Sequence, residues 1–527
     1  MSIRSVRRAS TAAVTLATAA AGIVLFAGAP AQAATAPPTT TDPAAAAAGW
    51  LARQLTGGTH LRTTFGGTSY DDYGGTADAV LGMATAKVAG STIKAATDWL
   101  AANADAYASL HDTSGVPGPY DGSVAKLALV AQVTGRDATS FGGFNLLKAL
   151  QDDQCTAVGN ADGSDFTKAA CPGVGSARNI YSSVSESLAI LVEARAGGAY
   201  APSSDAVSYF LSLQCPNGGF TGLTSACTDN SNASVDETAY AAMALQALGN
   251  QQAALTKAVD WLLQARSKAG YWVAQGGADA DTTGLATAAL AAAGRDVGTS
   301  RAWLVSQQVT TGPSLGKGAS RGALKYQGAF DKTSSVKATA DALPGLAKDG
   351  SFATLTDAGL SSAAPVLALD APRLKSQAHR GGTQTVTGTG FAVGEKVRAV
   401  LHSAPVAVAT GTANAAGTVS LRFTVPTSAT LGSHTVELVG LTSGLRSTSA
   451  EFTVSAATAG GVPAPSTGST GATGSTGSAS GCGSPGTLAC TGRDGRTTRL
   501  ELIVGGGLVL AGAGALWLGR RREHVQA

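Results

Sequence analysis

The sequence predicts a multidomain protein with an all-α head, a small β-sandwich, a low-complexity linker and a C-terminal transmembrane segment. Three observations predict this order. Six similar alanine-rich helical segments recur between residues 42 and 364. Period-two alternation rich in Val and Thr replaces them over residues 371–455. Glycine then recurs at every third position from Gly468 to Gly477, within a flexible linker over residues 456–487.

The chain begins with a predicted export signal. Three arginines within the first eight residues precede an uncharged, mostly apolar segment that ends at Gly28, and Ala31-Gln32-Ala33 has the small-x-small pattern of a signal-peptidase site. Residues 1–33 are therefore predicted to be a secretory signal peptide. An uncleaved N-terminal anchor is the alternative, although the apolar run is short for a membrane span.

Six segments of the head are predicted to be helices of one kind. Each has a small hydroxyl residue near its start and carries Ala, Leu, Val and Met on nearly all faces, so each should be buried all round. The aligned hydroxyl residues are Thr76, Ser123, Ser187, Thr238, Thr283 and Thr339. The glycines that close the six units are Gly90, Gly135, Gly197, Gly249, Gly294 and Gly350.

More polar segments alternate with these helices. In stretches such as "AAAAAGWLARQL", "TIKAATDWLAANA" and "LTKAVDWLLQARS", apolar residues recur at helical spacing, as expected of helices with one wet face. Six buried inner helices alternating with six half-exposed outer helices describe a closed double ring. Closure removes the unburied ends that an open stack of repeats would leave.

One outer segment carries a family resemblance. In "FLSLQCPNGGF", Gln214 precedes Gly218 by four residues and Phe220 follows two residues later. This resembles the Gln-x-x-x-Gly-x-Trp/Phe signature of the prenyltransferase and squalene-cyclase repeat, and Trp261 to Trp272 is a looser copy. The resemblance implies an (α/α)6 toroid over residues 42–364. The superfamily includes terpene cyclases, protein prenyltransferases and noncatalytic carriers, so the fold alone does not settle the activity.

The stretch "DADTTGLATAALAAAG" contains the acids on which an enzymatic reading depends. Cyclases of this superfamily protonate their substrate with the middle acid of an Asp-x-Asp-Asp motif; Asp279 and Asp281 match two of its acids, but Thr282 replaces the last. Asp281 and Asp236 stand at the same position before the aligned hydroxyl of their helices, where a carboxylate satisfies free backbone amides. We therefore expect Asp279 and Asp281 to be helix caps, and we predict no catalytic residue.

A carbohydrate-active enzyme is the alternative, because double rings of six helix pairs also carry glycosidases and polysaccharide lyases. These enzymes need two carboxylates about 5 to 10 Å apart across a cleft. The acids expected at one mouth of the ring are Asp78, Glu186, Asp236, Glu237, Asp279 and Asp281, with Tyr70, Tyr73, Tyr120 and Tyr181 as candidate sugar platforms.

No metal or cofactor is expected. A prenyltransferase-like zinc site would need a histidine on an inner helix, and the only histidines of the head, His60 and His111, do not lie near an inner-helix start. The cysteines of the head lack any C-x-x-C pair, which argues against a zinc site. In an exported chain, local disulfides are expected between Cys155 and Cys171 and between Cys215 and Cys227.

The segment over residues 371–455 resembles the immunoglobulin-like modules of bacterial surfaces, without their cysteine pair. Its strands are predicted in "TQTVTGTGF", "KVRAVLH", "GTVSLRFTVP", "HTVELVGL" and "SAEFTVS". We expect it to act as a stalk.

The C-terminus, residues 488–527, carries a second export feature. An apolar run over residues 502–519 can span a bilayer, and three arginines follow it. With the preceding pentapeptide, this resembles the sorting signal of Gram-positive surface proteins, in its actinobacterial Leu-Ala-x-Thr-Gly variant. The pentapeptide is Leu488, Ala489, Cys490, Thr491 and Gly492. The resemblance implies that a sortase cleaves after Thr491 and joins the protein to peptidoglycan; a plain membrane anchor is the alternative.

Composition supports an exported protein and excludes a nucleic-acid partner. The formal net charge is only +3, and 13% of the residues are charged. We therefore expect a protein of the cell wall or the outer face of the membrane whose noncatalytic head binds an unknown small molecule or glycan. A carbohydrate-active hydrolase or lyase is the first alternative, and a terpene-cyclase-like enzyme the second.

Overall fold

The computed structural model describes residues 36–110, 120–158, 171–178, 180 and 182–457. The predicted signal peptide, nearly all of the linker and the whole sorting signal lie outside these residues. Within the described part of the chain, no helix is long and apolar enough to cross a membrane. The predicted span over residues 502–519 is outside that part.

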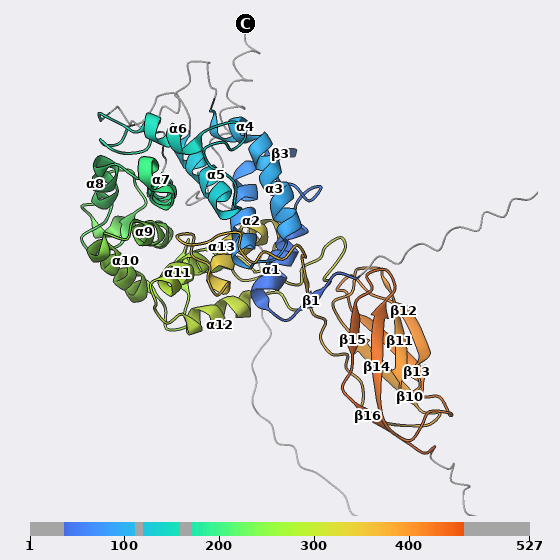
Figure 1. Ribbon diagram of the computed structural model, residues 1–527. Coiled ribbons are helices and arrows are strands. Elements are labelled where there is room, and N and C mark those ends of the chain that lie inside the picture. The colour runs from blue at the N-terminus through green and yellow to red at the C-terminus, as the bar shows by residue number, and fades with distance from the viewer. Residues whose placement is uncertain (1–35, 111–119, 159–170, 179, 181, 458–527) are drawn as a thin grey trace, which may run out of the picture.

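Six inner helices form a closed ring (Figure 1). Each helix contacts the next, and the last, α13, contacts the first, α2. All six contain the aligned hydroxyl residue. Their bounds are α2 Tyr73–Thr85, α5 Asp121–Val133, α7 Ser183–Ala196, α9 Val235–Leu248, α11 Ala280–Ala292 and α13 Lys332–Leu346.

Six outer helices surround this ring, and each packs on one or two adjacent inner helices. A short helix, α4 (Ala104–Ala108), follows the outer helix α3. The chain therefore contains a helical toroid-like domain. The outer helices are α1 Pro43–Ala52, α3 Gly90–Ala102, α6 Leu146–Asp153, α8 Ser204–Ser212, α10 Gln252–Ala265 and α12 Gly298–Gln307.

The expectation of one wet face was wrong for α1. Its residues from Ala44 to Ala52 are all buried. Later segments of the chain cover its outer side: a Cβ at Gly322 would lie 2.8 Å from the carbonyl oxygen of Ala46, and a Cβ at Gly49 would overlap Pro365. The sequence pattern of α1 did not reveal this cover because the covering residues lie about 270 to 320 positions away.

The aligned hydroxyl residues have a structural role. In four of the six repeats the hydroxyl oxygen accepts a hydrogen bond from a backbone N–H. The donor lies in the connection between the outer helix and the inner helix that follows it. Leu61 donates to Thr76, Phe220 to Thr238, Trp272 to Thr283 and Leu324 to Thr339, at 2.8 to 3.1 Å. In these four repeats the bond ties the inner helix to the connection from its own outer helix.

Glutamines link successive outer helices. The Gln214 amide donates to the carbonyl oxygen of Ala254 in α10 at 2.9 Å, and Gln308 donates to Pro43 in α1 at 2.8 Å. The second bond joins the last outer helix to the first. The glutamine of the repeat signature, Gln214, therefore links α8 to α10, and Gln308 makes the corresponding bond where the ring closes.

The expected closing glycines are confirmed at four repeats and wrong at two. The four that have positive φ angles at or just after the helix end are Gly135, Gly197, Gly249 and Gly294. Gly90 instead begins α3, because α2 already ends at Thr85. Gly350 lies four residues beyond the end of α13, and Pro344 lies inside that helix near its C-terminal end.

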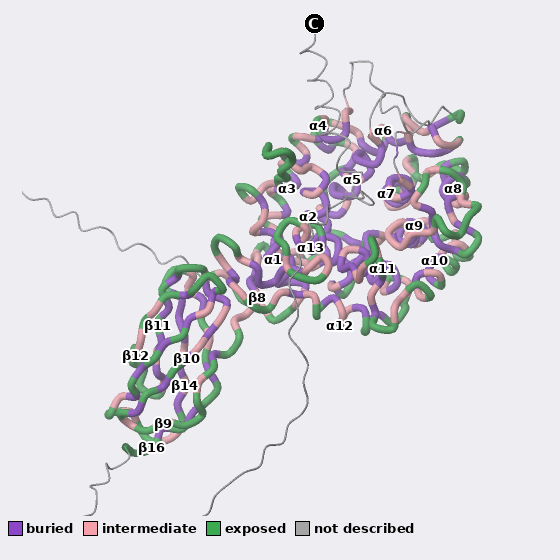
Figure 2. The backbone as a smooth tube through the Cα atoms, turned by 180° about the vertical axis from the view of Figure 1, so that it is seen from behind, coloured by how far each residue is buried: buried purple, intermediate pink, exposed green. Residues whose placement is uncertain are grey.

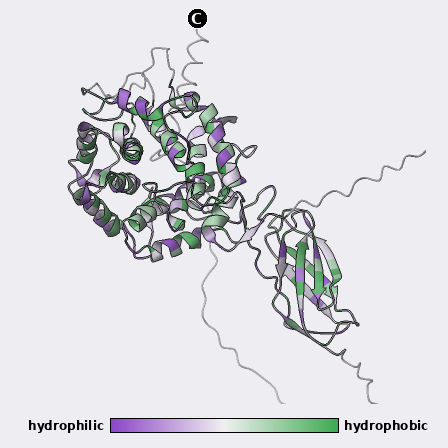
Figure 3. Cartoon of the chain, viewed as in Figure 1, coloured by the Kyte–Doolittle hydropathy of each residue, from purple (hydrophilic) through white to green (hydrophobic). Residues whose placement is uncertain are grey.

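The β-rich region contains two sheets that enclose a second core (Figure 2). One has the strand order β12-β11-β14-β16-β9 with β15 paired to β14, and β10 and β13 form the other. All five predicted strands are present, and apolar residues lie along them (Figure 3). Short strands β9, β12 and β15 were not predicted. The bounds are β9 Gln377–His379, β10 Thr383–Gly388, β11 Lys396–His402, β12 Val406–Thr412, β13 Val419–Thr424, β14 Gly432–Gly440, β15 Arg446–Thr448 and β16 Phe452–Ser455.

The head and the β-rich region contact each other through defined bonds. The backbone N–H of Ser314 donates to the carbonyl oxygen of Gly390 at 3.0 Å. The buried guanidinium of Arg321 lies 3.3 Å from the carboxylate of Asp370 and donates to the carbonyl oxygen of Ala368. Strands β1 (Thr39–Thr40) and β8 (Val366–Leu367) pair beside this junction (Figure 1).

Candidate functional site

The candidate site lies inside the ring, near the N-terminal ends of the inner helices. The residues two before and two after each aligned hydroxyl are four apart, so they share one helix face. On five inner helices this face carries charged or phenolic side chains. They are Asp78 on α2, Asp121 on α5, Asp236 and Tyr240 on α9, Asp281 on α11, and Lys337 and Asp341 on α13.

Asp281, Asp341 and Lys337 form the centre of this site. Lys337 Nζ is 3.6 Å from Asp281 Oδ2 and makes a shorter contact with Asp341 Oδ2. Burial and the neighbouring charge of Asp341 raise the pKa of Asp281 well above its usual value. Burial opposes ionisation of Asp341 too, but Lys337 and a hydrogen bond from Asp281 lower the pKa of Asp341 overall. Asp281 therefore holds the proton and donates it in a hydrogen bond to the Asp341 carboxylate.

A second ion pair completes the cluster. Lys126 Nζ on α5 lies 2.7 Å from Asp78 Oδ1 on α2, and both side chains are largely buried. Burial lowers the pKa of Lys126, but the charge of Asp78 outweighs it, so Lys126 stays protonated. The side chain of Lys337 is 44% exposed although it stands on the inner face of the ring. Water therefore reaches the cluster from within the ring.

Asp236 and Asp279 extend the site toward the rim. Burial, and then the charge of Glu237, raises the pKa of Asp236 to about 7. Asp279 caps α11: its Oδ1 accepts the N–H of Thr282 at 3.2 Å, and its Oδ2 accepts a hydrogen bond from Gln327 at 3.1 Å. Glu237 accepts a hydrogen bond from the hydroxyl of Ser234.

Glu186 lies apart from this cluster. It is buried on α7, where its Oε2 accepts the N–H of Ala177 at 2.9 Å, and burial raises its pKa to about 8. Its acidic neighbours are Glu193 on the same helix and Asp121 on α5, which accepts the N–H of Arg178. Glu186 and Asp121 thus hold the segment that leads into α7.

The opposite end of the ring is closed by the segment after α13. Phe352 is buried and stacks on Tyr240 with ring centroids 6.4 Å apart. Arg195 donates to the carbonyl oxygens of Phe352 and Leu355 at 2.6 and 2.8 Å. The acidic cluster therefore has a floor at this end of the ring.

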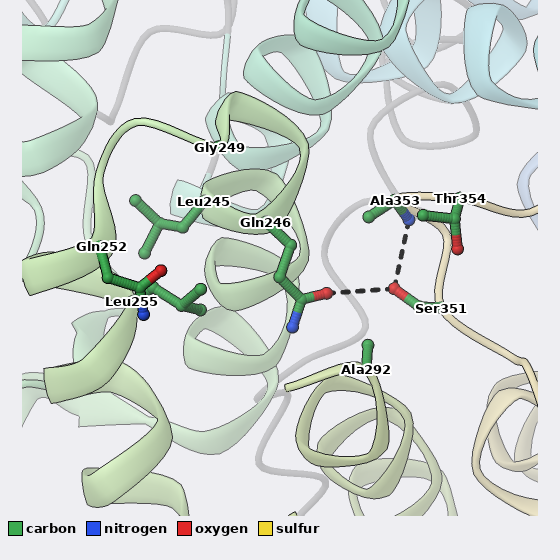
Figure 4. Close-up of a pocket in the computed structure, with 9 residues that line it drawn as sticks. All are labelled: Leu245, Gln246, Gly249, Gln252, Leu255, Ala292, Ser351, Ala353 and Thr354. Atoms are coloured by element: carbon green, nitrogen blue, oxygen red, sulfur yellow. Dashed lines mark hydrogen bonds between the residues drawn. The ribbon is translucent and has the colours of Figure 1, made fainter. Parts of the chain in front are cut away.

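A shallow pocket of about 360 Å³ lies outside this floor (Figure 4). It is lined by the ends of α9 and α11, by the start of α10 and by the segment from Ser351 to Thr354. The Ser351 hydroxyl donates to Gln246 Oε1 at 3.3 Å and accepts the N–H of Ala353. No titratable side chain lines this pocket, so it offers binding surface but no acid or base.

The structure separates the predicted acids. Asp78, Asp236, Glu237, Asp279 and Asp281 gather at one mouth, whereas Glu186 belongs to another buried cluster. The expected cap is confirmed for Asp279 only. The carboxyl group of Asp281 turns toward α13, because Asp279 already occupies the cap position two residues earlier.

Three members of the cluster were not predicted: Lys126, Lys337 and Asp341. A signal for Asp341 was present in the sequence. Thr-Ala-Asp occurs at both Thr76–Asp78 and Thr339–Asp341, so an acid two residues after the aligned hydroxyl is repeated on neighbouring helices. Among the predicted sugar platforms, Tyr73 stacks on two other rings. Its ring centroid lies 5.2 Å from that of Trp99 and 5.9 Å from that of Tyr107. Tyr181 lies outside the described residues.

The cysteines pair as expected: Cys155 with Cys171, and Cys215 with Cys227. The disulfides are consistent with an extracellular location. Across the described ranges, no group of three or more His, Cys, Asp and Glu side chains is arranged to hold a metal ion.

No known protein family and no curated protein matches this chain. Among solved structures, the apo type II terpene cyclase MstE from Scytonema is similar with 16% identity and a TM-score of 0.40, over 58% of this chain and 97% of that one. A variant of it bound to geranylgeranyl dihydroxybenzoate has 17% identity, a TM-score of 0.40, and coverages of 59% and 97%. A protein from Actinoplanes has 16% identity, a TM-score of 0.38, and coverages of 58% and 98%. These scores are low, so the toroid assignment rests on the helix arrangement itself and no activity follows from the similarity.

Proposed function

We propose that this protein is an exported surface protein whose helical head binds a small ligand at the mouth formed by the inner-helix starts. The β-rich region, as an immunoglobulin-like stalk, and the glycine-spaced linker hold the head away from the wall. The observation that carries this proposal is the water-accessible cluster of Asp281, Asp341 and Lys337 inside a ring whose other end is closed.

The composition of the inner face favours binding of a polar ligand. Beside the charged residues, the same two positions on the inner helices carry small side chains such as Ser185, Ala125 and Ala189. Small residues leave room around the ion pairs, and a few convergent polar groups in a concave site are typical of ligand binding. Asp281 and Asp341 are hydrogen-bonded to each other, which is closer than the carboxylate spacing of about 5 to 10 Å that glycoside hydrolysis needs.

The test is a ligand screen with matched variants. Soluble sugars, amines and amino acids are screened for a rise in Tm of the purified protein, because a ligand that binds only the folded state stabilises it. Lys337→Met and Asp281→Asn should abolish the shift that a true ligand causes. Asp98→Asn, an exposed acid paired with Lys94, should keep it. A shift that survives both cluster variants would place the ligand elsewhere.

A second candidate function is acid catalysis by Asp281. The supporting observation is that burial and Asp341 keep Asp281 protonated, as a proton donor requires. A binding head loses only affinity when Asp281 becomes Asn. A protein that uses Asp281 as its acid loses turnover of a bound ligand while the ligand still binds, so product formation measured on each ligand from the screen separates the two.

Attachment to the wall is part of the proposal and rests on the Leu-Ala-x-Thr-Gly sequence before the apolar segment. Thr491→Ala should move the protein from the peptidoglycan fraction to the membrane fraction, because the predicted sortase could not form its acyl intermediate. Thr487, immediately before the pentapeptide, provides the control: Thr487→Ala should leave the protein in the wall fraction. Equal fractionation of the wild type and Thr491→Ala would contradict sorting.

A further inference from the structure

The rim of the mouth is unusually apolar. Six large apolar side chains of the described part of the head are well exposed, and five of them lie on connections that lead from an outer helix to an inner helix. The five are Phe65, Val158, Val174, Leu223 and Val273; the sixth, Val305, lies on α12. Since these connections all meet the N-terminal ends of the inner helices, the five residues belong to the end of the ring that carries the acidic cluster.

Two of these residues lie next to the acids of the mouth. Val273 is 56% exposed on β6 (Trp272–Ala274) and pairs with Ala278, the residue before the helix cap Asp279. Leu223 is 51% exposed and follows Gly222, where a Cβ would lie 3.6 Å from Glu237 Oε1. Exposed apolar side chains and buried carboxyl groups therefore stand beside each other on adjacent repeats.

The charges at the mouth favour a cation. The titratable groups that face one another there are seven carboxyl groups, two lysines and three phenols. The carboxyl groups are those of Asp72, Asp78, Asp236, Glu237, Asp279, Asp281 and Asp341, the lysines are Lys126 and Lys337, and the phenols are those of Tyr107, Tyr240 and Tyr326. Lys126 pairs with Asp78, and Lys337 is shared between Asp341 and Asp281. Among the described residues no ion pair joins Asp236, Glu237 or Asp279 to a cation. An added positive charge would compensate them.

We propose that the ligand of this mouth is a cationic amphiphile, with an ammonium head group bound between Asp281 and Asp236 and an apolar chain lying against Leu223 and Val273. This inference rests on the proposed binding function and gives its ligand a chemical class. An ammonium group donates hydrogen bonds and carries a full charge, so it favours the ionised form of both acids. Binding therefore releases protons, and the affinity rises with pH through the neutral range.

The experiment is calorimetric titration of the purified full-length protein with three probes below their micelle concentrations. Dodecylammonium has both features, butylammonium has the head group without the chain, and dodecanoate has a chain with the opposite charge. Dodecylammonium should bind at least about tenfold more tightly than butylammonium, since burying even part of an alkyl chain gives that ratio. It should also bind at least about tenfold more tightly than dodecanoate, because the acids of the mouth repel a carboxylate head group. Proton release is measured by repeating the titration in buffers of different ionisation enthalpy.

Matched variants test where the alkyl chain of the bound probe lies. Leu223→Ser combined with Val273→Ser should weaken dodecylammonium about tenfold and leave butylammonium unchanged. Val305→Ser removes the exposed apolar residue of α12 and should change neither. All three residues are exposed, so an unchanged Tm verifies that the variants fold.

Four results would overturn the inference. Dodecanoate binding as tightly as dodecylammonium would contradict the cationic head group, and an equal loss in Val305→Ser would contradict the apolar rim. Dodecylammonium could fail to bind while a polar ligand still raises the Tm of the wild type but not of Lys337→Met. The proposed ligand class would then be wrong, and the proposed binding function would stand. If no probe and no screened ligand binds, both fall.

Discussion

Thr238 shows how one side chain connects two helices of a repeat. Its hydroxyl accepts the N–H of Phe220 at 2.8 Å and donates to the carbonyl oxygen of Ser234, and the residue is fully buried. Thr238→Val keeps the shape but leaves the N–H of Phe220 without a partner, which costs about 1 to 3 kcal/mol. Urea unfolding should show this loss. Thr256→Val, at an exposed position of α10, should change the free energy of unfolding by less than about 0.5 kcal/mol.

Glu186 gives the head a dependence on pH. Its pKa is about 8 in the folded protein and about 4.5 when unfolded, so the folded state holds a proton that the unfolded state releases. Stability therefore falls as pH rises through this window. Glu186→Gln retains an acceptor for the N–H of Ala177 and carries no charge, so the decline should flatten by roughly 1 to 4 kcal/mol at pH 9.

Glu193 also has a pKa raised by burial to about 8, so the flattening is partial. The measurement is the urea midpoint from pH 5 to pH 9. Glu451→Gln, an exposed residue of the β-rich region, serves as the control and should follow the wild type. A parallel decline in the wild type and in Glu186→Gln would show that Glu186 is already ionised in the folded state.

Five acids of the mouth could be predicted from the sequence, but its two lysines and Asp341 could not, nor could the direction in which each carboxyl group turns. Asp279 and Asp281 are both acids at a helix start, and either can cap in principle. The choice depends on Lys337 and Asp341, which belong to a different helix and are 56 to 62 residues away. Contacts of that separation are set by the ring closure, so the local pattern does not contain them.

At the level of elements, the helical pattern was sufficient because each repeat is locally encoded. All six inner helices contain their aligned hydroxyl residue. This is because each repeat carries the hydroxyl residue, the alanine-rich helical segment and the turn residues in the same order. Strand β12 was missed because "VAVATGT" is half exposed and lies at the sheet edge, where pairing with β11 rather than burial defines it. The burial of α1 was missed for the related reason that it depends on distant covering segments.

The closest helix contact depends on a glycine. A Cβ at Gly284 on α11 would overlap Ala342 on α13 and lie 2.6 Å from the carbonyl oxygen of Asp341. Helix propensity alone predicts that Gly284→Ala stabilises by about 1 kcal/mol. We expect the opposite sign, a loss of roughly 2 kcal/mol or more, because backbone atoms must move apart in a packed core.

Gly298→Ala is the control for this change. Gly298 is exposed at the start of α12, where a Cβ would meet only the flexible carboxylate of Asp296 at 3.3 Å. The two variants should therefore differ in sign or in size by at least about 2 kcal/mol in thermal or urea unfolding. Equal effects would mean that α11 and α13 are not in this close contact.

On the scale of the whole molecule, the junction between the head and the β-rich region depends on a buried arginine. Arg321 is 1% exposed, and it donates to the carbonyl oxygens of Thr310 and Ala368 while pairing with Asp370. A Cβ at Gly390 of the β-rich region would lie 3.0 Å from the Arg321 side chain. The side chain thus connects a head loop, the interdomain segment and the β-rich region, so the β-rich region should be held at a fixed angle to the head.

Arg321→Met should loosen this junction without unfolding either region. The methionine fills part of the volume but leaves the carbonyl oxygens of Thr310 and Ala368 without their donor, at about 1 to 3 kcal/mol for each unsatisfied group. Small-angle scattering should then give a larger maximum dimension, and the β-rich region should melt in a transition separate from that of the head. Arg446→Met is the control, because it removes an exposed arginine paired with Glu437 on β14 and such pairs contribute less than about 1 kcal/mol. Identical scattering curves for Arg321→Met and the wild type would show that the bonds between Ser314 and Gly390 suffice to fix the angle.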